Sequence, residues 1–328
     1  MHILIVNNTR IPVTTYGGTE RVIWYLGKEL TDLGHKVTYL VNQGSHCPFA
    51  DVLFLDPAKP MAAQIPDDVD VVHFNIMPPA EGIGKPYIYT LHGNHTNPEP
   101  LDINTTFVSR NHASRYNSAS FVHNGMDWND YGPVQLDNKR NYFHFLGNAA
   151  WRVKNVKGAI KVISGVKGGK LKVLGGNRLN IKMGFRLTLN PNIQFHGMVG
   201  GAEKLRLLQG SKGLVFPVRW HEPFGLAITE SLYFGCPVLG TPYGSLPELV
   251  PAEVGFLSNN SRDLTEAART IDKYSRKRCH EYAADLFNSR LMAERYLEKY
   301  ATVLNGQTLN QEKPQLQQVQ TVKFLEWH

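Results

Sequence analysis

Residues 214–230 read LVFPVRWHEPFGLAITE and combine a short apolar strand, a turn that contains two prolines, and a helix that starts near Phe224. Amides in the first turn of a helix have no partner within the helix, and the helix dipole adds positive charge at that end. We therefore expect the amides of Gly225, Leu226 and Ala227 to hold a diphosphate. Such a strand-to-helix turn is the repeating unit of α/β folds.

Two carboxylates flank this expected anion site. Glu222 lies just before the helix start, and Glu230 lies two turns into the helix. Carboxylates accept hydrogen bonds and repel phosphate, so they suit sugar hydroxyls on either side of a diphosphate. Taken alone, the pattern favours a simpler interpretation, in which Glu222 stabilises the helix start and Glu230 lies on the surface.

Strand-like and helix-like segments alternate on both sides of this turn. Apolar, β-branched or aromatic runs predict strands at residues 3–7, 36–41, 51–55, 69–74, 87–91, 105–109 and 120–123, and again at 142–146, 171–174, 193–196, 214–218 and 238–240. Helices are expected at residues 19–33, 156–166, 202–209, 224–234, 264–274, 276–287 and 291–304. A polar stretch from Trp128 to Asn141 separates the two sets and predicts a linker.

This order predicts two α/β domains, with a ligand cleft at the carboxyl ends of both sheets. We expect a first domain over residues 1–138 and a second over 139–304, with the last helix packing back on the first. In the polar tail, residues 305–328, we expect the part up to Gln320 to be loosely held and residues 322–327 to dock onto the body.

The composition describes a globular protein, with 42% hydrophobic and 19% charged residues in a chain of 328. Cys47, Cys236 and Cys279 lie far apart and form neither a zinc pattern nor a disulfide framework, which favours a reducing cytoplasm. The N-terminus is expected to be a strand and not a signal peptide. No apolar run approaches the ~20 residues of a spanning helix.

The formal net charge of +7 has two interpretations. It indicates either a solubilising surface with some cations directed at a phosphate-bearing ligand, or attraction to anionic lipid or nucleic acid. Basic residues are interpreted as scattered, with local concentrations at residues 152–161 and 276–278 and no aromatic-interleaved basic stripe. We favour the first interpretation and expect no nucleic-acid partner.

The segment from His221 to Glu230 is similar to the E-x7-E segment of retaining glycosyltransferase family 4. Residues 231–241, and Gly244 with the run 247–250, resemble the motifs that follow in that family. Its members have the GT-B fold, an α/β architecture of two Rossmann-like domains facing each other across a cleft. The resemblance covers most of the chain and implies the same fold.

This resemblance implies a hexosyltransferase-type enzyme, which moves a sugar from a nucleoside-diphosphate sugar to an acceptor hydroxyl with retention at the anomeric carbon. It also implies that Glu230 holds the ribose and Glu222 the sugar hydroxyls. Asp68-Val69-Asp70 leads into a strand and is expected to cap it, not to bind a metal. We therefore expect no metal and no other cofactor.

Motifs of the first domain also resemble the family. Gly17 and Gly18 precede the first expected helix like the family's early glycine loop, and glycines allow close backbone approach to an anion. His92 ends a strand and matches the histidine usually placed near the transferring sugar. His73 is left open between the cleft and a hydrogen-bonded core position. Residues 122–127 resemble an Asn-Gly turn that shapes the cleft.

The sequence departs from the family in the loop at residues 146–158. Members usually carry an arginine and a lysine there, which bind the donor diphosphate. Asn148 stands in the place of the arginine, whereas Lys157 matches the lysine. We expect Lys157 to be the main cation, with Arg152 or Lys154 equally preferred as the second.

Two more loops resemble those that surround the nucleobase and the ribose, one at Gly176 and one at His196 and Gly197. The expected catalytic residues are Glu222, His92 and Lys157. The expected donor-binding residues are Gly17, Gly18, Arg152, Lys154, Gly176, His196, Gly197, Phe224, Gly225, Leu226 and Glu230.

The expected partners are a nucleotide-sugar donor and a carbohydrate, lipid-linked or small-molecule acceptor, as in glycan or glycoconjugate biosynthesis. The expected location is the cytoplasm, and a peripheral contact with the inner membrane face is left open. One alternative is a GT-B epimerase or hydrolase acting on the nucleotide sugar alone. The other is a non-catalytic nucleotide-sugar-binding protein, which the departure at Asn148 keeps open.

Overall fold

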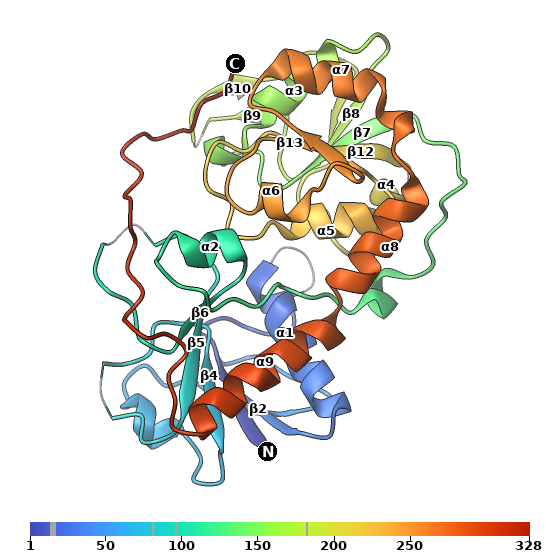
Figure 1. Ribbon diagram of the computed structural model, residues 1–328. Helices are drawn as coiled ribbons and strands as arrows, with labels where there is room; N and C mark the ends of the chain where they lie inside the picture. Colours follow the sequence, from blue (N-terminus) through green and yellow to red (C-terminus); the bar gives the residue numbers. More distant parts are fainter. Residues whose placement is uncertain (14–17, 81, 96–97, 182) are drawn as a thin grey trace. The chain divides into compact units, whose positions relative to one another are not determined.

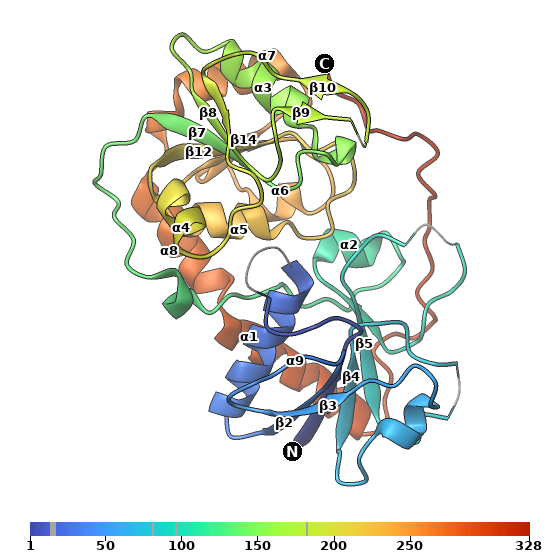
Figure 2. The ribbon, with the colours of Figure 1, turned by 180° about the vertical axis from the view of Figure 1, so that it is seen from behind.

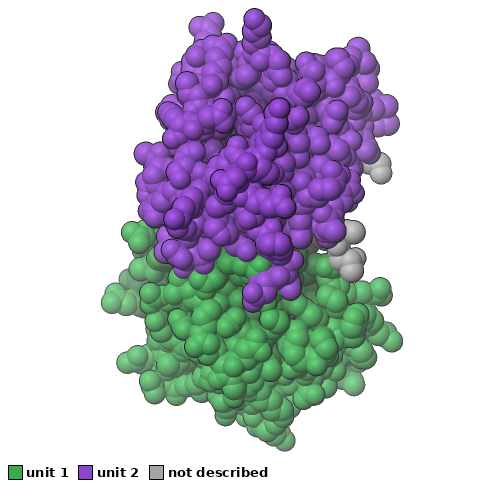
Figure 3. Space-filling view, turned by 90° about the vertical axis from the view of Figure 1, so that its right-hand side faces the viewer, with its two compact units in different colours: residues 1–13, 17–128, 287–320 green, residues 14–16, 129–286, 321–328 purple. Residues whose placement is uncertain are grey.

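The computed structural model describes residues 1–13, 18–80, 82–95, 98–181 and 183–328. These residues form two compact units, each with its own six-stranded sheet (Figure 3). Unit 1 contains residues 1–13, 18–128 and 287–320, and unit 2 contains residues 129–286 and 321–328. The chain therefore passes into unit 2 after Trp128, ten residues before the domain boundary placed from the sequence.

Unit 1 is a parallel α/β unit, with strand order β3-β2-β1-β4-β5-β6 (Figure 1). Its strands are β1 (His2–Val6), β2 (Lys36–Val41), β3 (Asp51–Phe54), β4 (Val71–Phe74), β5 (Tyr87–Leu91) and β6 (Thr105–Phe107). Its helices are α1 (Gly18–Asp32), η1 (Met61–Gln64), α2 (Arg110–Ser114) and α9 (Ser289–Leu304). The central strands are buried throughout, as is typical of parallel sheets covered by helices. The strand expected at residues 120–123 is reduced to an isolated bridge between Phe121 and Phe107.

Helix α9 belongs to unit 1, where it packs against α1. The Asn-Gly turn expected to shape a cleft contacts the start of this helix. A Cβ at Gly125 would lie 2.2 Å from the carbonyl oxygen of Asn288, so only glycine fits there. Met126 accepts a hydrogen bond from the amide of Ser289 at 2.9 Å and donates one to Phe287 at 2.9 Å. The glycine is thus explained by close backbone packing.

Unit 2 repeats the architecture, with strand order β11-β8-β7-β12-β13-β14 and all pairs parallel (Figure 2). Its strands are β7 (Tyr142–Leu146), β8 (Leu171–Leu174), β11 (Ile193–Phe195), β12 (Ser211–Phe216), β13 (Val238–Gly240) and β14 (Gly255–Leu257). Its helices are η2 (Trp128–Tyr131) at the crossing, then η3 (Arg152–Lys154), α3 (Val156–Ser164), α4 (Gly201–Gln209), α5 (Leu226–Tyr233), α6 (Leu246–Leu249), α7 (Ser261–Arg269), η4 (Ile271–Lys273) and α8 (Arg276–Leu286). The strands β9 (Leu179–Asn180) and β10 (Arg186–Leu187) form a separate antiparallel hairpin.

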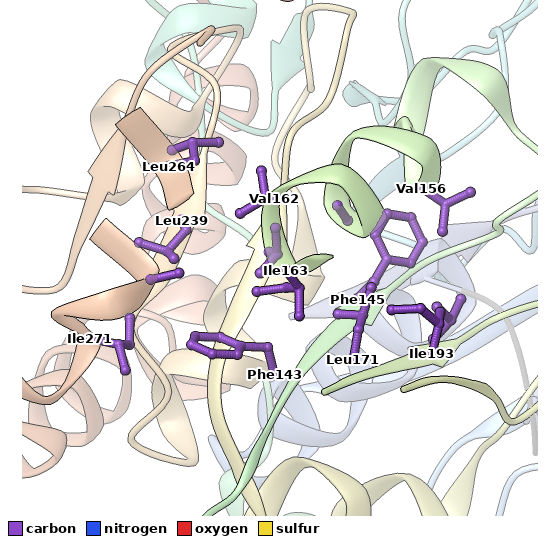
Figure 4. Close-up of a cluster of buried hydrophobic side chains, with 14 of the residues drawn as sticks. Phe143, Phe145, Val156, Val162, Ile163, Leu171, Ile193, Leu239, Leu264 and Ile271 are labelled. Carbon is purple, nitrogen blue, oxygen red and sulfur yellow. The ribbon is translucent and has the colours of Figure 1, made fainter. Parts of the chain in front are cut away.

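The core of unit 2 lies between the sheet and helices α3 and α7 (Figure 4). Phe143 and Phe145 of β7 pack there against Val162 and Ile163 of α3 and Leu264 of α7. The apolar runs read from the sequence therefore form the strands that face these helices. The expectation of two parallel-sheet α/β domains is confirmed.

The tail after α9 is held along its length, and the expectation of a loose segment up to Gln320 is wrong. Leu316 is buried in the core of unit 1, and the amide of Leu101 donates to the carbonyl of Pro314 at 2.7 Å. Residues 321–328 then join unit 2, where Trp327 packs against the core. The amide of His328 donates to the carbonyl of Asn259 at 2.9 Å, as expected of a segment that docks.

Each unit buries one histidine between hydroxyl groups. His73 on β4 makes hydrogen bonds with the hydroxyls of Tyr300 at 2.8 Å and Thr90 at 2.7 Å. His144 on β7 makes hydrogen bonds with the hydroxyls of Ser211 at 2.7 Å and Ser231 at 2.8 Å. Burial lowers the pKa of each histidine from 6.5 to about 3, so both are neutral at pH 7. His73 is thus a hydrogen-bonded core residue.

These histidines predict acid-sensitive stability. Unfolding returns each imidazole to a pKa near 6.5, so the unfolded chain binds more protons between about pH 6.5 and pH 3, and stability falls as the pH drops through that window. At pH 5 each histidine accounts for about 2 kcal/mol of this loss. Urea unfolding at pH 7.5 and pH 5 measures it, and the variant His144→Gln should lose less stability on acidification than the unmodified protein. An equal loss in both would contradict this account.

No helix in the described part of the chain combines the length and the apolar composition needed to cross a bilayer.

Candidate active site

The turn after β12 is fixed by its own glycine and by the loop after β13. Gly225 has φ +88°, in the left-handed region, so α5 begins at Leu226 and not at Phe224. The amide of Ser245 donates to the carbonyl of Glu222 at 2.9 Å, and its hydroxyl donates to the carbonyl of Phe224 at 2.7 Å. The Phe224 side chain is buried, so it packs the turn, while Gly225 and Leu226 are half-buried at the helix start.

Glu222 is held in a buried ion pair with Lys154. The Nζ atom of Lys154 donates to Oε2 of Glu222 at 2.6 Å, and the indole of Trp220 donates to the same oxygen at 2.7 Å. Lys154 Nζ also lies 5.2 Å from the ring centre of Phe216 and 4.9 Å from that of Trp220. Oε1 of Glu222 accepts no hydrogen bond from the described residues, so the carboxylate is anchored through one oxygen.

Glu230, one of the expected donor-binding residues, has partners that the sequence did not suggest. Lys204 of α4 donates to Oε1 of Glu230 at 2.6 Å, and the hydroxyl of Tyr131 donates to the same oxygen at 2.5 Å. All three side chains are buried. Tyr131 comes from the stretch expected to be a linker, and no motif marks Tyr131 or Lys204, so only the fold reveals them.

The β7–α3 loop places its cations in different environments. Lys154 is buried against Glu222, whereas Arg152 and Lys157 are exposed. Asn155 has φ +56° and joins the loop to β12, because its side chain caps α3 at the amide of Gly158 and also donates to the carbonyl of Pro217 at 3.0 Å. Lys154 thus differs from the other two expected cations, which stay accessible.

Arg152 and Lys157 line a cavity of about 260 Å³. Other lining residues come from the β9–β10 hairpin, the β12–α5 turn and the C-terminal tail, and they include Arg186, Arg219 and Phe324. The guanidinium groups of Arg152 and Arg219 lie 4.8 and 5.2 Å from the ring centre of Phe324. Four cationic side chains at one cavity suit an anionic ligand. Oδ1 of Asn148, in contrast, accepts a hydrogen bond from the backbone amide of Ala150 at 3.0 Å.

The loops after β7, β8 and β11 are joined by close backbone contacts. The amides of Gly176 and Gly197 each donate to the other's carbonyl at 3.2 Å, and a Cβ at Gly176 would lie 2.9 Å from that of Ala149. Burial, and then the charge of Lys172, lower the pKa of His196. Nε2 of His196 is buried without a hydrogen-bond partner among the described residues.

Two of the predicted site residues, Gly18 and His92, lie in unit 1. A third predicted residue, Gly17, lies outside the described residues. Gly18 opens α1. His92 follows β5, and its Nε2 makes a hydrogen bond with Oδ1 of Asn75, which follows β4, at 2.7 Å. Burial lowers the pKa of His92 to about 4, so its imidazole is neutral at pH 7.

The acidic pair before β4 is engaged in structural contacts. The carboxylate of Asp70 accepts a hydrogen bond from the backbone amide of His2 at 2.7 Å. The carboxylate of Asp68 accepts one from Nζ of Lys36 at 2.7 Å. Among the described residues, no group of three or more histidine, cysteine, aspartate or glutamate side chains is arranged to hold a metal ion.

Gly244 provides a test of the glutamate-bearing turn. Its φ is +65°, and a Cβ there would lie 2.2 Å from the backbone nitrogen of Glu222. We expect Gly244→Ala to displace this turn and to lower the free energy of unfolding by more than about 2 kcal/mol. Gly168 has φ +69° with nothing near its missing Cβ, so Gly168→Ala should cost only about 1 kcal/mol. Urea unfolding of the two variants measures the difference, and equal losses would contradict the close contact.

Residues 127–288 match the family model described as glycosyl transferases group 1. The matched residues make up most of unit 2.

Curated relatives match part of the chain. An uncharacterized 41.2 kDa protein in the cps region of Klebsiella pneumoniae is 26% identical over 123 residues, 35% of this chain and 34% of that protein. A GDP-mannose-dependent alpha-(1-6)-phosphatidylinositol dimannoside mannosyltransferase of Mycobacterium tuberculosis is 29% identical over 122 residues, 36% of this chain and 32% of that enzyme. The chain thus spans about a third of the length of these relatives.

The fold is also found among solved structures. The crystal structure of AviGT4, a glycosyltransferase involved in avilamycin A biosynthesis, has a TM-score of 0.73 at 24% identity, over 94% of this chain and 99% of that one. The likeness identifies the architecture as the GT-B fold, with two parallel-sheet α/β domains.

Proposed function

We propose that this protein is a retaining glycosyltransferase that moves a sugar from a nucleoside-diphosphate sugar to an acceptor hydroxyl. One observation carries the proposal: the buried Lys154–Glu222 pair joins the start of α5 to the loop that bears Arg152 and Lys157. A carboxylate for hydroxyls, a helix start for phosphate and a loop that bears cations are thereby held on adjoining segments. The group 1 domain match supports the same class of reaction.

In the proposed complex the diphosphate binds the amides at the start of α5 and the accessible cations Arg152 and Lys157. Glu222 accepts a hydrogen bond from a sugar hydroxyl through Oε1, while Lys154 and Trp220 hold Oε2. Glu230 receives the ribose hydroxyls. The hydrogen bonds from Lys204 and Tyr131 hold the Glu230 carboxylate in place through Oε1.

The proposed reaction keeps the sugar's anomeric configuration. The bond between the anomeric carbon and the diphosphate oxygen breaks, the acceptor oxygen bonds to the same face of that carbon, and the acceptor proton passes to the departing diphosphate. Arg152 and Lys157 stabilise the negative charge that develops on the leaving group. His92 of unit 1 remains a predicted catalytic residue, and its neutral imidazole adds no charge.

Glu222 carries the first test. A panel of nucleoside-diphosphate sugars is screened by thermal shift, since a ligand at 100 times its Kd adds about 2.7 kcal/mol to stability. With the donor so found, we expect Glu222→Gln to lower kcat about 100-fold. Glu253→Gln, at an exposed pair with Arg278, should leave kcat unchanged. Product NMR should show the donor's anomeric configuration.

A second variant separates chemistry from folding. Glu222→Gln leaves Lys154 buried without its counter-charge, which lowers stability by about 3 kcal/mol. Adding Lys154→Met removes that charge, so the double variant should regain stability but not turnover. If turnover returns together with stability, Glu222 is a structural residue and the proposed role is wrong.

Two alternative activities predict different products from the same donor. An epimerase or hydrolase would consume the nucleotide sugar without an acceptor. A binding protein would show the thermal shift with no turnover. Both outcomes count against sugar transfer, and we infer transfer in glycan or glycoconjugate synthesis from the domain match and the named mannosyltransferase relative.

We expect sugar transfer to need no metal ion. The Asp-x-Asp pair is occupied, because Asp68 binds Lys36 and Asp70 binds the backbone of His2. Arg152 and Lys157 offer the positive charge that a metal would supply elsewhere. Initial rates with and without excess EDTA measure this, with rates agreeing within about twofold. Abolition by EDTA and recovery with Mg²⁺ or Mn²⁺ would overturn the expectation.

A further inference from the structure

The β9–β10 hairpin of unit 2 presents apolar side chains to solvent. Leu179 lies opposite Leu187 in the antiparallel pair, on one face of the hairpin. Every odd-numbered residue from Leu179 to Leu189 is apolar, and these six side chains are between 47 and 80% exposed. Ile181 and Phe185 near the turn are 70 and 66% exposed. An apolar surface of this extent marks an interaction site.

The polar side chains of the hairpin face the body of unit 2, and Met183 and Phe185 near the turn also line the cavity beside Arg152 and Lys157. Arg186 and Thr188 are buried, and Arg186 donates to the carbonyl of Asn177 at 2.8 Å. The guanidinium of Arg186 lies 4.7 Å from the ring centre of Phe195 in β11. Side chains of a strand alternate between faces, and in water the apolar face normally packs inward. Here the polarity is reversed, which indicates an apolar partner for the outer face.

The charge around this hairpin is of one sign. Residues 138–202 contain 12 lysines and arginines and no aspartate or glutamate. Because the whole chain has a net charge of +7, the residues outside this stretch carry a net negative charge. The interpretation that basic residues are scattered was therefore wrong for residues 138–202. Arg178 beside β9 and Lys161 on α3 are exposed, and Lys157 on α3 lies 3.5 Å from the carbonyl of Phe185. Cations therefore border the apolar face.

We propose that the β9–β10 hairpin docks on an anionic lipid membrane, with its apolar side chains inserted among the headgroups. Lys161 and Arg178 bind the lipid phosphates. Apolar insertion combined with flanking cations is the chemistry of interfacial membrane binding. A second copy of the chain fits less well, because it would bring two acid-free surfaces together. The proposal goes beyond sugar transfer and does not require it.

Vesicle flotation of the full-length protein tests the proposal. We expect binding to vesicles of phosphatidylcholine mixed with phosphatidylglycerol, and weaker binding to phosphatidylcholine alone. The double variant Ile181→Ser/Phe185→Ser should reduce binding about tenfold or more, because two inserted side chains are lost. Phe54→Ser is the control, since Phe54 is a 53% exposed aromatic residue on β3 of unit 1. All these positions are exposed, so circular dichroism should be unchanged.

A second pair of variants tests the charges. Lys161→Gln/Arg178→Gln should reduce binding to the anionic vesicles about tenfold or more, whereas Lys273→Gln/Lys277→Gln, on η4 and α8, should not. Three outcomes would overturn the proposal: no flotation with either vesicle, flotation of the serine variant equal to that of the unmodified protein, or a lipid-free dimer that the serine substitutions dissociate. The last would identify the hairpin as an interface between copies. Donor turnover without lipid tests sugar transfer separately, so the two proposals can fail independently.

Discussion

The contact between Lys154 and Glu222, 2.6 Å long and buried, is the interaction on which the site of unit 2 depends. It joins the loop after β7 to the turn after β12, two neighbouring strands of the sheet. Removing either charge would leave the other buried and unpaired, so the two loops are constrained to remain together. Asn155 reinforces the connection through the carbonyl of Pro217. The loop that bears Arg152 and the turn that leads into α5 meet at this junction.

The fold could be predicted because its strands are buried on both faces and therefore read as continuous apolar runs. The exact ends of the helices and strands were harder to predict. The start of α5 moved because Gly225 adopts a positive φ, and residues 120–123 do not form a strand because only Phe121 bridges to β6. The tail up to Gln320 was taken as loose from its polar composition, but Leu316 anchors it in the core of unit 1.

The site was predicted at the level of motifs and not of pairings. From the sequence, Lys157 was expected to be the main phosphate-binding cation, with Arg152 or Lys154 equally preferred as the second. No local pattern shows that Lys154 contacts Glu222, 68 residues away. The contacts of Tyr131 and Lys204 with Glu230 also depend on the tertiary fold. The acid-free stretch at residues 138–202, in contrast, was visible in the sequence. The structure adds that the hairpin within this stretch exposes apolar side chains.

The discontinuous path of the chain has a consequence for its biosynthesis. Along the described residues the chain passes between units after residues 128, 286 and 320. During translation, β4 and β5 emerge early, but Tyr300 of α9, which binds His73, emerges only after all of residues 129–286. Unit 2 in turn receives Trp327 last. Unit 1 therefore cannot complete its core on the ribosome before α9 is made, and unit 2 cannot complete its core before Trp327 is made.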